Sequence, residues 1–413
     1  MLRLRFFVHF VALQLFSTLF YTLDIILSLY YNNAAVIIMN WFGDRLKTWR
    51  FIKRNIVFFI AALAATITCF LVPPDKAYLD YFDWKTLSCL FLTLAVVCAL
   101  RNIKFFTILA RKLVSIAGNL RSLFLLLITI TFIGSMIIAN DMALITFLPL
   151  GYFALSVTKQ EKYMAYLFVL QNISANLGGM LTPFGNPQNL YLYSYFHIPT
   201  GEFCQIMLPA FLLAVALLMV ACLPIKPLRF SIENKYAETL HIKKTILYCI
   251  LFLASILIVF RVIPFELGLI VIPAILFFVD RRCLKMVDYG LLGTFFFFFI
   301  FAGNLARLDA VNRLISSLLK KDTLIVSVLS CQFISNVPSA VLLSRFTGDY
   351  AALLLGVNIG GTGTLIASLA SLITFSEFKI LHPEQAKKYL CIFTIANVAF
   401  VVILTVAAKL FWV

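Results

Sequence analysis

Apolar runs long enough to cross a lipid bilayer recur along this 413-residue chain, and they constrain its fold more than any other feature. A hydrocarbon core of about 30 Å requires about 20 apolar residues in a helix. The runs SLFLLLITITFIGSMII and GTFFFFFIFAGNL are continuous, whereas the strands of a membrane barrel alternate. Because backbone groups in lipid must be paired within their own segment, we expect an all-α polytopic protein of the cell membrane.

Uninterrupted runs predict single membrane-crossing helices at residues 55–73, 84–100, 203–223, 242–260, 264–280, 287–304 and 389–411. Residues 1–50 are interpreted as an apolar N-terminal extension followed by a basic loop. Within this extension two alternatives stay open, a true spanning helix or a start at Met39.

Charge and motif content exclude several classes of function. The 34 Lys and Arg outnumber the 18 Asp and Glu, but they cluster in short loops between apolar runs, which is typical of membrane topology and not of nucleic-acid binding. The nine cysteines form no CxxC pair, so neither a metal site nor a disulfide framework is expected. Without a GxSxG, Walker A or HExxH motif, the sequence predicts no enzyme and no cofactor.

Four further apolar segments carry a polar interruption at their centre: residues 121–157, 163–196, 323–347 and 350–375. The interruptions occur twice in the same order, and the N-x-G-G pattern stands in register at Asn176 and Asn358. This order predicts an internal repeat, with residues 51–225 and 245–413 as its halves and residues 226–244 as a cytoplasmic linker. Duplicated broken helices are typical of secondary transporters and indicate the binding site.

Basic loops predict the orientation of the two halves, and they lie at residues 43–55, 101–113 and 158–163. Because both ends of residues 121–157 would face the cytoplasm, this segment is expected to enter the membrane, turn near Asn140 and return as a re-entrant hairpin. Residues 323–347 are then expected to form a second hairpin that enters from the outside, as in an inverted repeat. Four cations fall on the outer side against the charge rule: Arg307, Arg313, Lys320 and Lys321.

A break in a membrane helix exposes backbone groups that can bind ions. N-terminal ends offer N–H groups and partial positive charge to an anion, and C-terminal ends offer carbonyls to Na⁺. Asparagine side chains can both donate and accept. The alternative for a single such residue is a kink or an interhelical hydrogen bond. The candidate substrate- and ion-binding residues are Asn140, Asp141, Asn176, Gly178, Gly179, Thr182, Pro183, Gly185, Asn186, Pro187, Gln188, Asn189, Ser335, Asn336, Asn358, Gly360, Gly361 and Thr362.

Asp141 is the acid at a predicted break. An ionisable group at membrane depth is a candidate cation ligand or proton carrier. The alternative is a side chain that reaches a watery vestibule at the hairpin tip. Val337 occupies the equivalent position in the second half, so the role of Asp141 is expected to be asymmetric.

Five stretches carry a resemblance to a known family: NDMALITFLPL, NLGGMLTPFGNPQNLYLY, FFFFFIFAGNLARL, QFISNVPSAVLL and GVNIGGTGTLIASLASLI. From about residue 50 to its end, the chain resembles the ion transporter superfamily of citrate and divalent anion sodium symporters, arsenite permeases and sodium/proton antiporters. It looks most like the bacterial citrate-transporter-like anion permeases. The resemblance implies an elevator-type carrier, with a scaffold that forms a homodimer and a transport domain of two opposed hairpins and two unwound helices.

In the symporters of this superfamily, a Ser-Asn-Thr tip on each hairpin binds substrate carboxylate and contributes to Na⁺ sites. The equivalent tips here begin at Ala139 and Ser335. Asn140 and Asn336 match the pattern, and transported Na⁺ is expected there, but neither threonine is present. The Asn140-Asp141 pair is instead similar to the arsenite permeases.

The function expected from the sequence is secondary active transport of a small anionic solute, a carboxylate or an inorganic oxyanion, coupled to Na⁺ or H⁺. The alternative is a Na⁺/H⁺ antiporter that uses Asp141. A hypothesis of a different class, a membrane scaffold or receptor that transports nothing, leaves the duplicated breaks unexplained.

Overall fold

The computed structural model describes residues 56–229 and 240–412. The extension predicted at residues 1–50 lies outside the described residues, as does most of the linker predicted at 226–244. The chain divides into two compact units, Met1–Phe59 and Ile60–Val413. Only residues 56–59, the start of the first described helix, belong to the former, so the architecture below is that of the latter.

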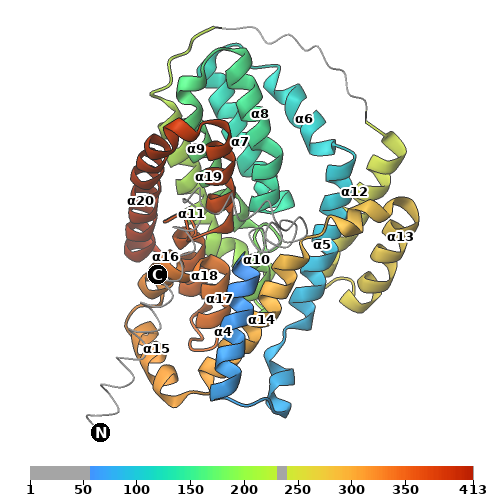
Figure 1. The fold of residues 1–413 in the computed structure, drawn as a ribbon, viewed down its shortest axis with the longest axis vertical. Helices are drawn as coiled ribbons and strands as arrows, with labels where there is room; N and C mark the ends of the chain where they lie inside the picture. The colour runs from blue at the N-terminus through green and yellow to red at the C-terminus, as the bar shows by residue number, and fades with distance from the viewer. Residues whose placement is uncertain (1–55, 230–239, 413) are drawn as a thin grey trace, which may run out of the picture. The chain divides into compact units, whose positions relative to one another are not determined.

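The described residues form α-helices and short 3₁₀ helices, and no strand occurs among them (Figure 1). In chain order the elements are α4 (Ile56–Leu71), η1 (Lys76–Tyr81), α5 (Trp84–Asn102), α6 (Phe105–Val114), α7 (Leu120–Ile138), α8 (Asn140–Val157), η2 (Glu161–Tyr163), α9 (Met164–Gly178), η3 (Gly179–Leu181), α10 (Pro187–Tyr195), α11 (Thr200–Cys222), α12 (Ile242–Val259), α13 (Phe265–Lys285), α14 (Tyr289–Ala306), α15 (Asp309–Lys321), α16 (Thr323–Ile334), α17 (Asn336–Leu343), α18 (Tyr350–Gly360), α19 (Leu369–Leu381), η4 (Pro383–Gln385) and α20 (Ala386–Phe411).

Seven of the described helices are long and apolar enough to cross a membrane, namely α5, α7, α8, α11, α12, α14 and α20. Several described helices carry large exposed apolar side chains, among them Phe278 on α13 and Leu410 on α20. In water such faces would be costly, whereas lipid tails accept them. The prediction of an all-α multi-pass membrane protein is confirmed.

Helices of the two predicted halves pack in the same order. α7, α8 and α9 lie side by side, and so do α16, α17 and α18 (Figure 1). Each group also contacts a helix of the other half, because α19 packs on α8 and α9 while α10 packs on α17 and α18. The interruptions predicted from the sequence all fall inside this interlocked set.

Asp caps begin α5 and α14 in the same way. Asp83 Oδ1 accepts from the Thr86 N–H at 2.9 Å, and Asp288 Oδ1 accepts from the Leu291 N–H at 3.0 Å. Such caps satisfy N–H groups that have no partner within the helix. The sequence stretches that begin with these two residues therefore form equivalent helix starts.

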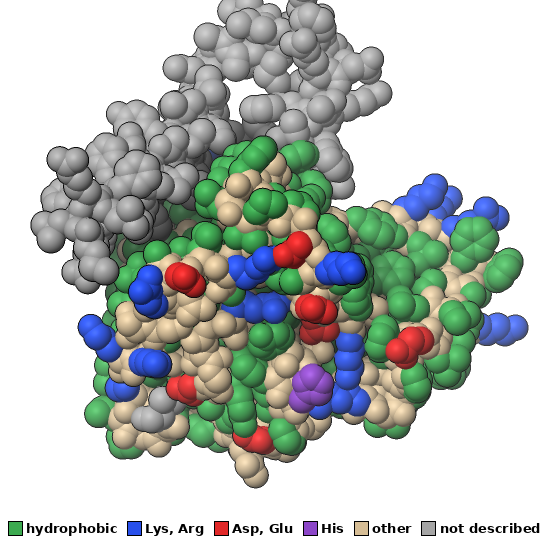
Figure 2. All heavy atoms as spheres, turned by 90° about the horizontal axis from the view of Figure 1, so that it is seen from below, with side chains coloured by type: hydrophobic (Ala, Val, Ile, Leu, Met, Phe, Trp, Pro, Cys, Tyr) green, Lys and Arg blue, Asp and Glu red, His purple; other side chains and the backbone are tan. Residues whose placement is uncertain are grey.

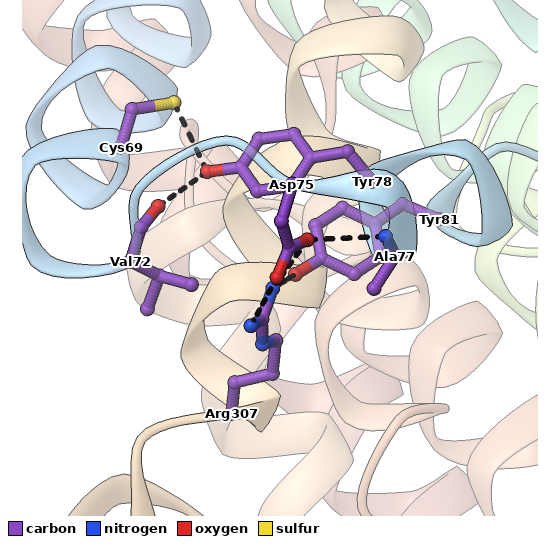
Figure 3. Close-up of polar contacts among 7 residues, drawn as sticks. All are labelled: Cys69, Val72, Asp75, Ala77, Tyr78, Tyr81 and Arg307. Atoms are coloured by element: carbon purple, nitrogen blue, oxygen red, sulfur yellow. Dashed lines mark hydrogen bonds and ion pairs between the residues drawn. The ribbon is translucent and has the colours of Figure 1, made fainter.

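An ion pair joins the end of α14 to the segment that leads into α5 (Figure 3). Arg307 binds both carboxylate oxygens of Asp75, at 3.0 and 2.6 Å, and donates to the hydroxyl of Tyr81 at 3.1 Å. The Arg307 guanidinium holds the pKa of Asp75 below its ordinary value. The C-terminal end of α14 thus lies beside the N-terminal end of α5.

The pairing of Arg307 bears on the charge conflict found in the sequence. Figure 2 views the end where η1 and α15 lie and shows Lys and Arg side chains mixed with Asp and Glu, surrounded by hydrophobic side chains. Lys409 likewise pairs with Asp322 at 2.7 Å. Cations at this end are therefore partly neutralised by neighbouring carboxylates.

Candidate functional site

Two hairpin tips have the same unusual backbone. Between α7 and α8, Ala139 has φ 66° and ψ 154°, and between α16 and α17, Ser335 has φ 74° and ψ 160°. This region is essentially restricted to glycine, and occupying it costs on the order of 1–3 kcal/mol per residue. Such strain persists only where the surroundings impose it, so both tips are held by their neighbours.

A buried asparagine follows each strained residue as the first residue of the next helix, and its side chain accepts from the N–H that comes after it. Asn140 Oδ1 accepts from the Asp141 N–H and Asn336 Oδ1 from the Val337 N–H, both at 2.9 Å. Asn140 also donates to Asn176 Oδ1 at 3.1 Å. The predicted tip residues are therefore built into the protein interior.

The second tip is tied to the second broken helix through its backbone. The Asn336 N–H donates to the carbonyl of Ala367 at 2.9 Å, and Ser335 Oγ donates to the same carbonyl at 3.3 Å. Gly361 lies against this tip, because a Cβ built on it would stand 2.8 Å from Asn336 Nδ2. Each tip thus contacts the broken helix of its own half.

Asn189 satisfies the carbonyls that the first break leaves open. Its Nδ2 donates to the carbonyls of Gly179, Met180 and Thr182 at 3.1, 3.2 and 3.3 Å. These carbonyls follow the end of α9, where the helical hydrogen-bond ladder stops. Gly185 packs against Gly179.

Gln332 plays the matching part at the second break, after α18. Its Nε2 donates to the carbonyl of Gly360 at 2.9 Å, and its Oε1 accepts from the Thr364 N–H at 2.8 Å. The buried hydroxyl of Thr362 has no hydrogen-bond partner among the described residues.

A threonine ties each break to the hairpin beside it. Thr182 Oγ1 donates to the carbonyl of Met136 at 2.8 Å, and Thr364 Oγ1 donates to the carbonyl of Gln332 at 3.1 Å. Met136 and Gln332 each stand three residues before the strained residue of a tip. The two halves therefore repeat this contact at equivalent positions.

Gly178 and Gly360 allow hairpin and broken helix to pack backbone to backbone. A Cβ on Gly178 would collide with the carbonyl oxygen of Phe132, and one on Gly360 would lie 2.9 Å from Cys331 Cβ and 3.0 Å from Val328 Cα. The first approach is the tighter one.

Asn358 connects the two breaks at the centre of the protein. Its Nδ2 donates to the carbonyl of Leu354 at 2.8 Å and to Asn189 Oδ1 at 2.6 Å. Its Oδ1 accepts from Asn186 Nδ2 and from Gln188 Nε2, each at 3.4 Å. One buried amide from the second half therefore binds three from the first.

A cavity of about 60 Å³ lies beside this centre. By about 15 Å³ for each water-sized occupant, it has room for roughly four. Asp141 and Asp288 line it, and the buried Oδ1 of Asp141 has no hydrogen-bond partner among the described residues. The other lining residues are Leu90, Thr93, Leu94, Ala139, Met142, Ile145, Phe184, Pro187, Leu291, Leu369 and Ile373.

The structure brings most of the predicted site residues together, but not all around one point. The amides of Asn140, Asn176, Asn186, Gln188, Asn189 and Asn358 form one hydrogen-bonded chain, to which Asn176 contributes its carbonyl as an acceptor for Asn186 at 3.3 Å. Asp141 and Pro187 face the cavity instead. Pro183 is buried beside the first break. No hydrogen bond joins the two hairpin tips within the described residues.

Sequence reasoning missed three residues of this region. Asp288 faces the cavity, Gln332 joins α16 to the second break, and Asn172 donates to Ser371 Oγ at 3.2 Å, which links α9 to α19. Asp288 had one available signal, its match with Asp83 at the start of α5 in the first half. Within the described part of the chain, no group of three His, Cys, Asp or Glu is placed to hold a metal ion.

Comparison with known proteins agrees with this architecture. A family model described as "Citrate transporter" matches residues 34–351. The uncharacterized transporter MJ0456 of Methanocaldococcus jannaschii is 33% identical over 337 residues, which cover 80% of this chain and 91% of that protein. The inner membrane protein YbiR of Escherichia coli is 28% identical over 315 residues, 74% of this chain and 82% of that protein.

A more limited similarity extends to plants. The silicon efflux transporter LSI3 of Oryza sativa subsp. japonica is 31% identical over 156 residues, 37% of this chain and 31% of that protein. The family match covers more than half of the chain, and the archaeal relative is matched over most of its own length. This chain is a membrane transporter that belongs to the citrate transporter family.

Proposed function

We propose that the protein is a secondary active carrier that moves a small solute, a carboxylate or an inorganic oxyanion, coupled to Na⁺ or H⁺. The observation that carries this proposal is the bridge made by Asn358 between two broken helices in the protein interior. Helices break at membrane depth only where protein or a watery cavity covers the exposed backbone. A purely structural role would not require two breaks joined by buried amides.

The carrier is proposed to be an inverted repeat of residues 51–225 and 245–413. Two observations support it. Thr182 and Thr364 make equivalent contacts with the hairpins of their own halves. α5 and α14 begin with equivalent Asp caps, yet the C-terminal end of α14 lies beside the N-terminal end of α5. The interrupted segments are the two hairpins, residues 121–157 and 323–347, and the two broken helices, residues 163–196 and 350–375.

We base a proposal for alternating access on a difference in helix packing between the two halves. Two contacts are closed, because α14 packs on α17 and α5 packs on α10. The proposed repeat makes two other pairs equivalent to these, α5 with α8 and α14 with α19. Residues of these four helices line the cavity instead. We propose that the hairpins and broken helices move as one elevator past α5 and α14, which closes this cavity and opens its counterpart. By the family resemblance, the carrier is proposed to act as a homodimer.

Coupling ions are proposed to bind next to Asn140 and Asn336. The C-terminal ends of α7, α9, α16 and α18 all stop in this region, and such ends offer carbonyl oxygens that suit Na⁺. The strained backbone at both tips is the kind of local cost that functional sites retain.

Uptake into proteoliposomes tests the proposal. The purified full chain would be given citrate, sulfate and silicic acid, the last because a relative is named a silicon efflux transporter. Each solute would be tested with a Na⁺ gradient, a pH gradient or neither. Accumulation that needs one gradient is expected, and the absence of uptake under every gradient would reject the carrier.

Asp141 faces the cavity, and this favours a second candidate function, a Na⁺/H⁺ antiporter. Its buried Oδ1 has no protein donor, as expected of a group that exchanges a proton for an ion. Proton release from protein in proteoliposomes, reported by a dye when Na⁺ is added without any solute, would support this function. Loss of that signal in Asp141→Asn would assign it to this residue.

A further inference from the structure

Two arginines join the helices that the proposed elevator would move to the helices that would stay in place. The moving set is the two hairpins and the two broken helices, and the frame is α5 and α14 with the elements packed on them, α12, α13 and η1. Arg345, which follows α17, donates to the carbonyl of Tyr81 in η1 at 2.5 Å. Arg261, which follows α12, donates to the carbonyl of Tyr193 in α10 at 2.7 Å. Each set therefore contributes one arginine that binds a backbone carbonyl of the other.

The guanidinium groups of both arginines also lie over tyrosine rings of α10. The guanidinium carbon of Arg345 stands 5.2 Å from the centre of the Tyr195 ring. That of Arg261 stands 4.6 Å from the centre of the Tyr193 ring. A cation within about 6 Å of a ring centre is attracted to the face of the ring. Because a guanidinium is planar, it can lie on a ring and still donate to a carbonyl, so each arginine is fixed by two contacts.

The carbonyl that Arg345 binds is fixed to the frame. Tyr81 is 6% exposed, and a Cβ built on Gly303 of α14 would stand 2.5 Å from its ring. Arg307, just after α14, donates to the hydroxyl of Tyr81 at 3.1 Å. Arg345 therefore links the second hairpin to α14 and not to a loop that could follow the hairpin as it moves.

The Arg345 contact and the cavity lie at opposite ends of α14. Asp288 and Leu291, at the start of this helix, line the cavity, whereas Gly303 belongs to its last turn. A hydrogen bond is lost when donor and acceptor separate beyond about 3.5 Å. A shift of the moving set along α14 by one helical turn, about 5.4 Å, would therefore break the contact between Arg345 and Tyr81. This contact belongs to the conformation that has the cavity.

Both arginines occupy positions that have a structural cost. Arg261 has a φ of 65°, in the left-handed region that glycine usually occupies at the end of a helix. Arg345 has a buried Nε without a hydrogen-bond partner among the described residues, and a buried donor without a partner is unfavourable. Local structure alone would therefore favour other residues here, and the contacts with Tyr81 and Tyr193 offset the cost.

We propose that Arg345 and Arg261 form a latch that holds the carrier in the conformation with the cavity. Both of its hydrogen bonds break when the moving set shifts past the frame. Arg345 is the stronger member, because its side chain is half-buried whereas that of Arg261 is exposed to water. This inference rests on the proposed carrier function, and it identifies residues that set the balance between the two conformations.

The rate at which a disulfide forms across the cavity measures this balance. Thr93→Cys and Ile145→Cys place thiols at cavity-lining positions of α5 and α8, and these join when the moving set shifts and closes the cavity. The full chain in proteoliposomes would be treated with diamide, and the cross-linked peptide followed over time by mass spectrometry. A hydrogen bond from a charged donor typically changes an equilibrium by about tenfold or more. Arg345→Gln in this background should therefore speed the cross-link about tenfold, and Arg261→Gln should speed it less.

Arg307→Gln is the matched control for the loss of an arginine at this end. Arg307 donates to the hydroxyl of the same Tyr81, but its side-chain hydrogen bonds stay within the frame and the segment that leads into it. Its loss should leave the rate of cross-linking unchanged. Arg345→Lys retains a charged donor and should restore much of the original rate, which a general loss of packing would not explain. Equal acceleration in Arg307→Gln and Arg345→Gln would contradict the latch.

The outcomes separate the latch from the proposed function. Faster cross-linking in both latch variants supports the latch and the motion together. Equal rates with and without Arg345→Gln and Arg261→Gln would reject the latch and leave the carrier in place. If Arg345→Gln fails to fold, the exposed Arg261 still allows this comparison through Arg261→Gln. If the disulfide forms in no background, the moving set does not shift, and the proposed elevator and the latch fail together.

Discussion

The two hairpins share a backbone and differ in chemistry. Their strained residues, Ala139 and Ser335, differ by less than 10° in φ and ψ, and each is followed by an asparagine whose side chain accepts from the next N–H. The arms differ in length, with 19 and 18 residues in α7 and α8 against 12 and 8 in α16 and α17. The tip geometry is therefore independent of how far the arms extend.

The two hairpins differ further in the residue that follows each asparagine and in the surroundings of that residue. Asp141 faces a cavity, whereas Val337 belongs to a helix packed on α14 and α10. The first tip therefore places a carboxylate beside a cavity, and the second tip places an apolar side chain in a packed helix. This comparison suggests four experiments.

Closing the cavity by a disulfide should have the largest effect. Thr93 on α5 and Ile145 on α8 both line the cavity, from two different helices. In the double variant Thr93→Cys with Ile145→Cys, a disulfide can form only if the walls approach to within about 7 Å between Cα atoms. Oxidation during transport should abolish uptake, and reduction should restore it. Each single variant is the control, and a complete cross-link that left uptake intact would contradict the proposed motion.

Removing the charge at the first tip should reduce coupled uptake at least tenfold. Asp141→Asn keeps the shape of the side chain but can neither ionise nor carry a proton. Solute exchange without a gradient should be less affected, because the bond that Asn140 accepts comes from the backbone N–H of residue 141 and does not need the carboxylate. Val337→Asn at the second tip is the matched control and should leave coupling unchanged. Equal losses in the two variants would show that the halves do not differ in chemistry.

The glycines behind the tips should differ in stability. Gly178→Ala drives a methyl group against the backbone of Phe132, and overpacking of this kind costs typically about 1–3 kcal/mol. Gly360→Ala meets its neighbours at about 3 Å and should cost less. Gly201→Ala, with open space around it, is the control. Melting temperatures in detergent would rank the three, and a greater loss in Gly360→Ala would reverse the comparison.

The positions of the breaks could be predicted from sequence because their cause is local. Glycine permits close approach and proline removes an N–H, so Gly178 and Pro187 predicted an interruption between them, and α9 and α10 end and begin at these residues. Asn358 was recognised by its pattern alone. Its four hydrogen bonds to partners in both halves were not predictable from that pattern.

Long-range juxtaposition and side-chain orientation account for what the sequence could not reveal. Asp288 begins an ordinary helix, and only the fold sets it across a cavity from Asp141. The directions of Asn186 and Gln188 depend on partners elsewhere in the chain, because Asn186 donates to the carbonyl of Asn176 and both side chains donate to Asn358 Oδ1. The expectation of an anionic solute came from the helix breaks and from the family resemblance, and it stays a prediction.

The smallest effect is expected at the ion pair between Asp75 and Arg307, outside both hairpins. Both side chains are more than a third exposed, so water and salt screen their attraction. Because the pKa of Asp75 is lowered in the folded protein, the pair contributes stability above the unfolded pKa of about 3.9 and loses it as the pH falls through the folded value. Asp75→Asn should therefore lower the melting temperature slightly at neutral pH, and this difference should vanish in strong acid and shrink in high salt.

Lys409→Met, which breaks the pair with Asp322 at the start of the second hairpin, provides the comparison. Asp75→Asn could instead lower the melting temperature as much as Gly178→Ala. The link between α14 and the start of α5 would then contribute as much stability as the packing behind the tips. The difference between the hairpins would not be the main determinant of stability.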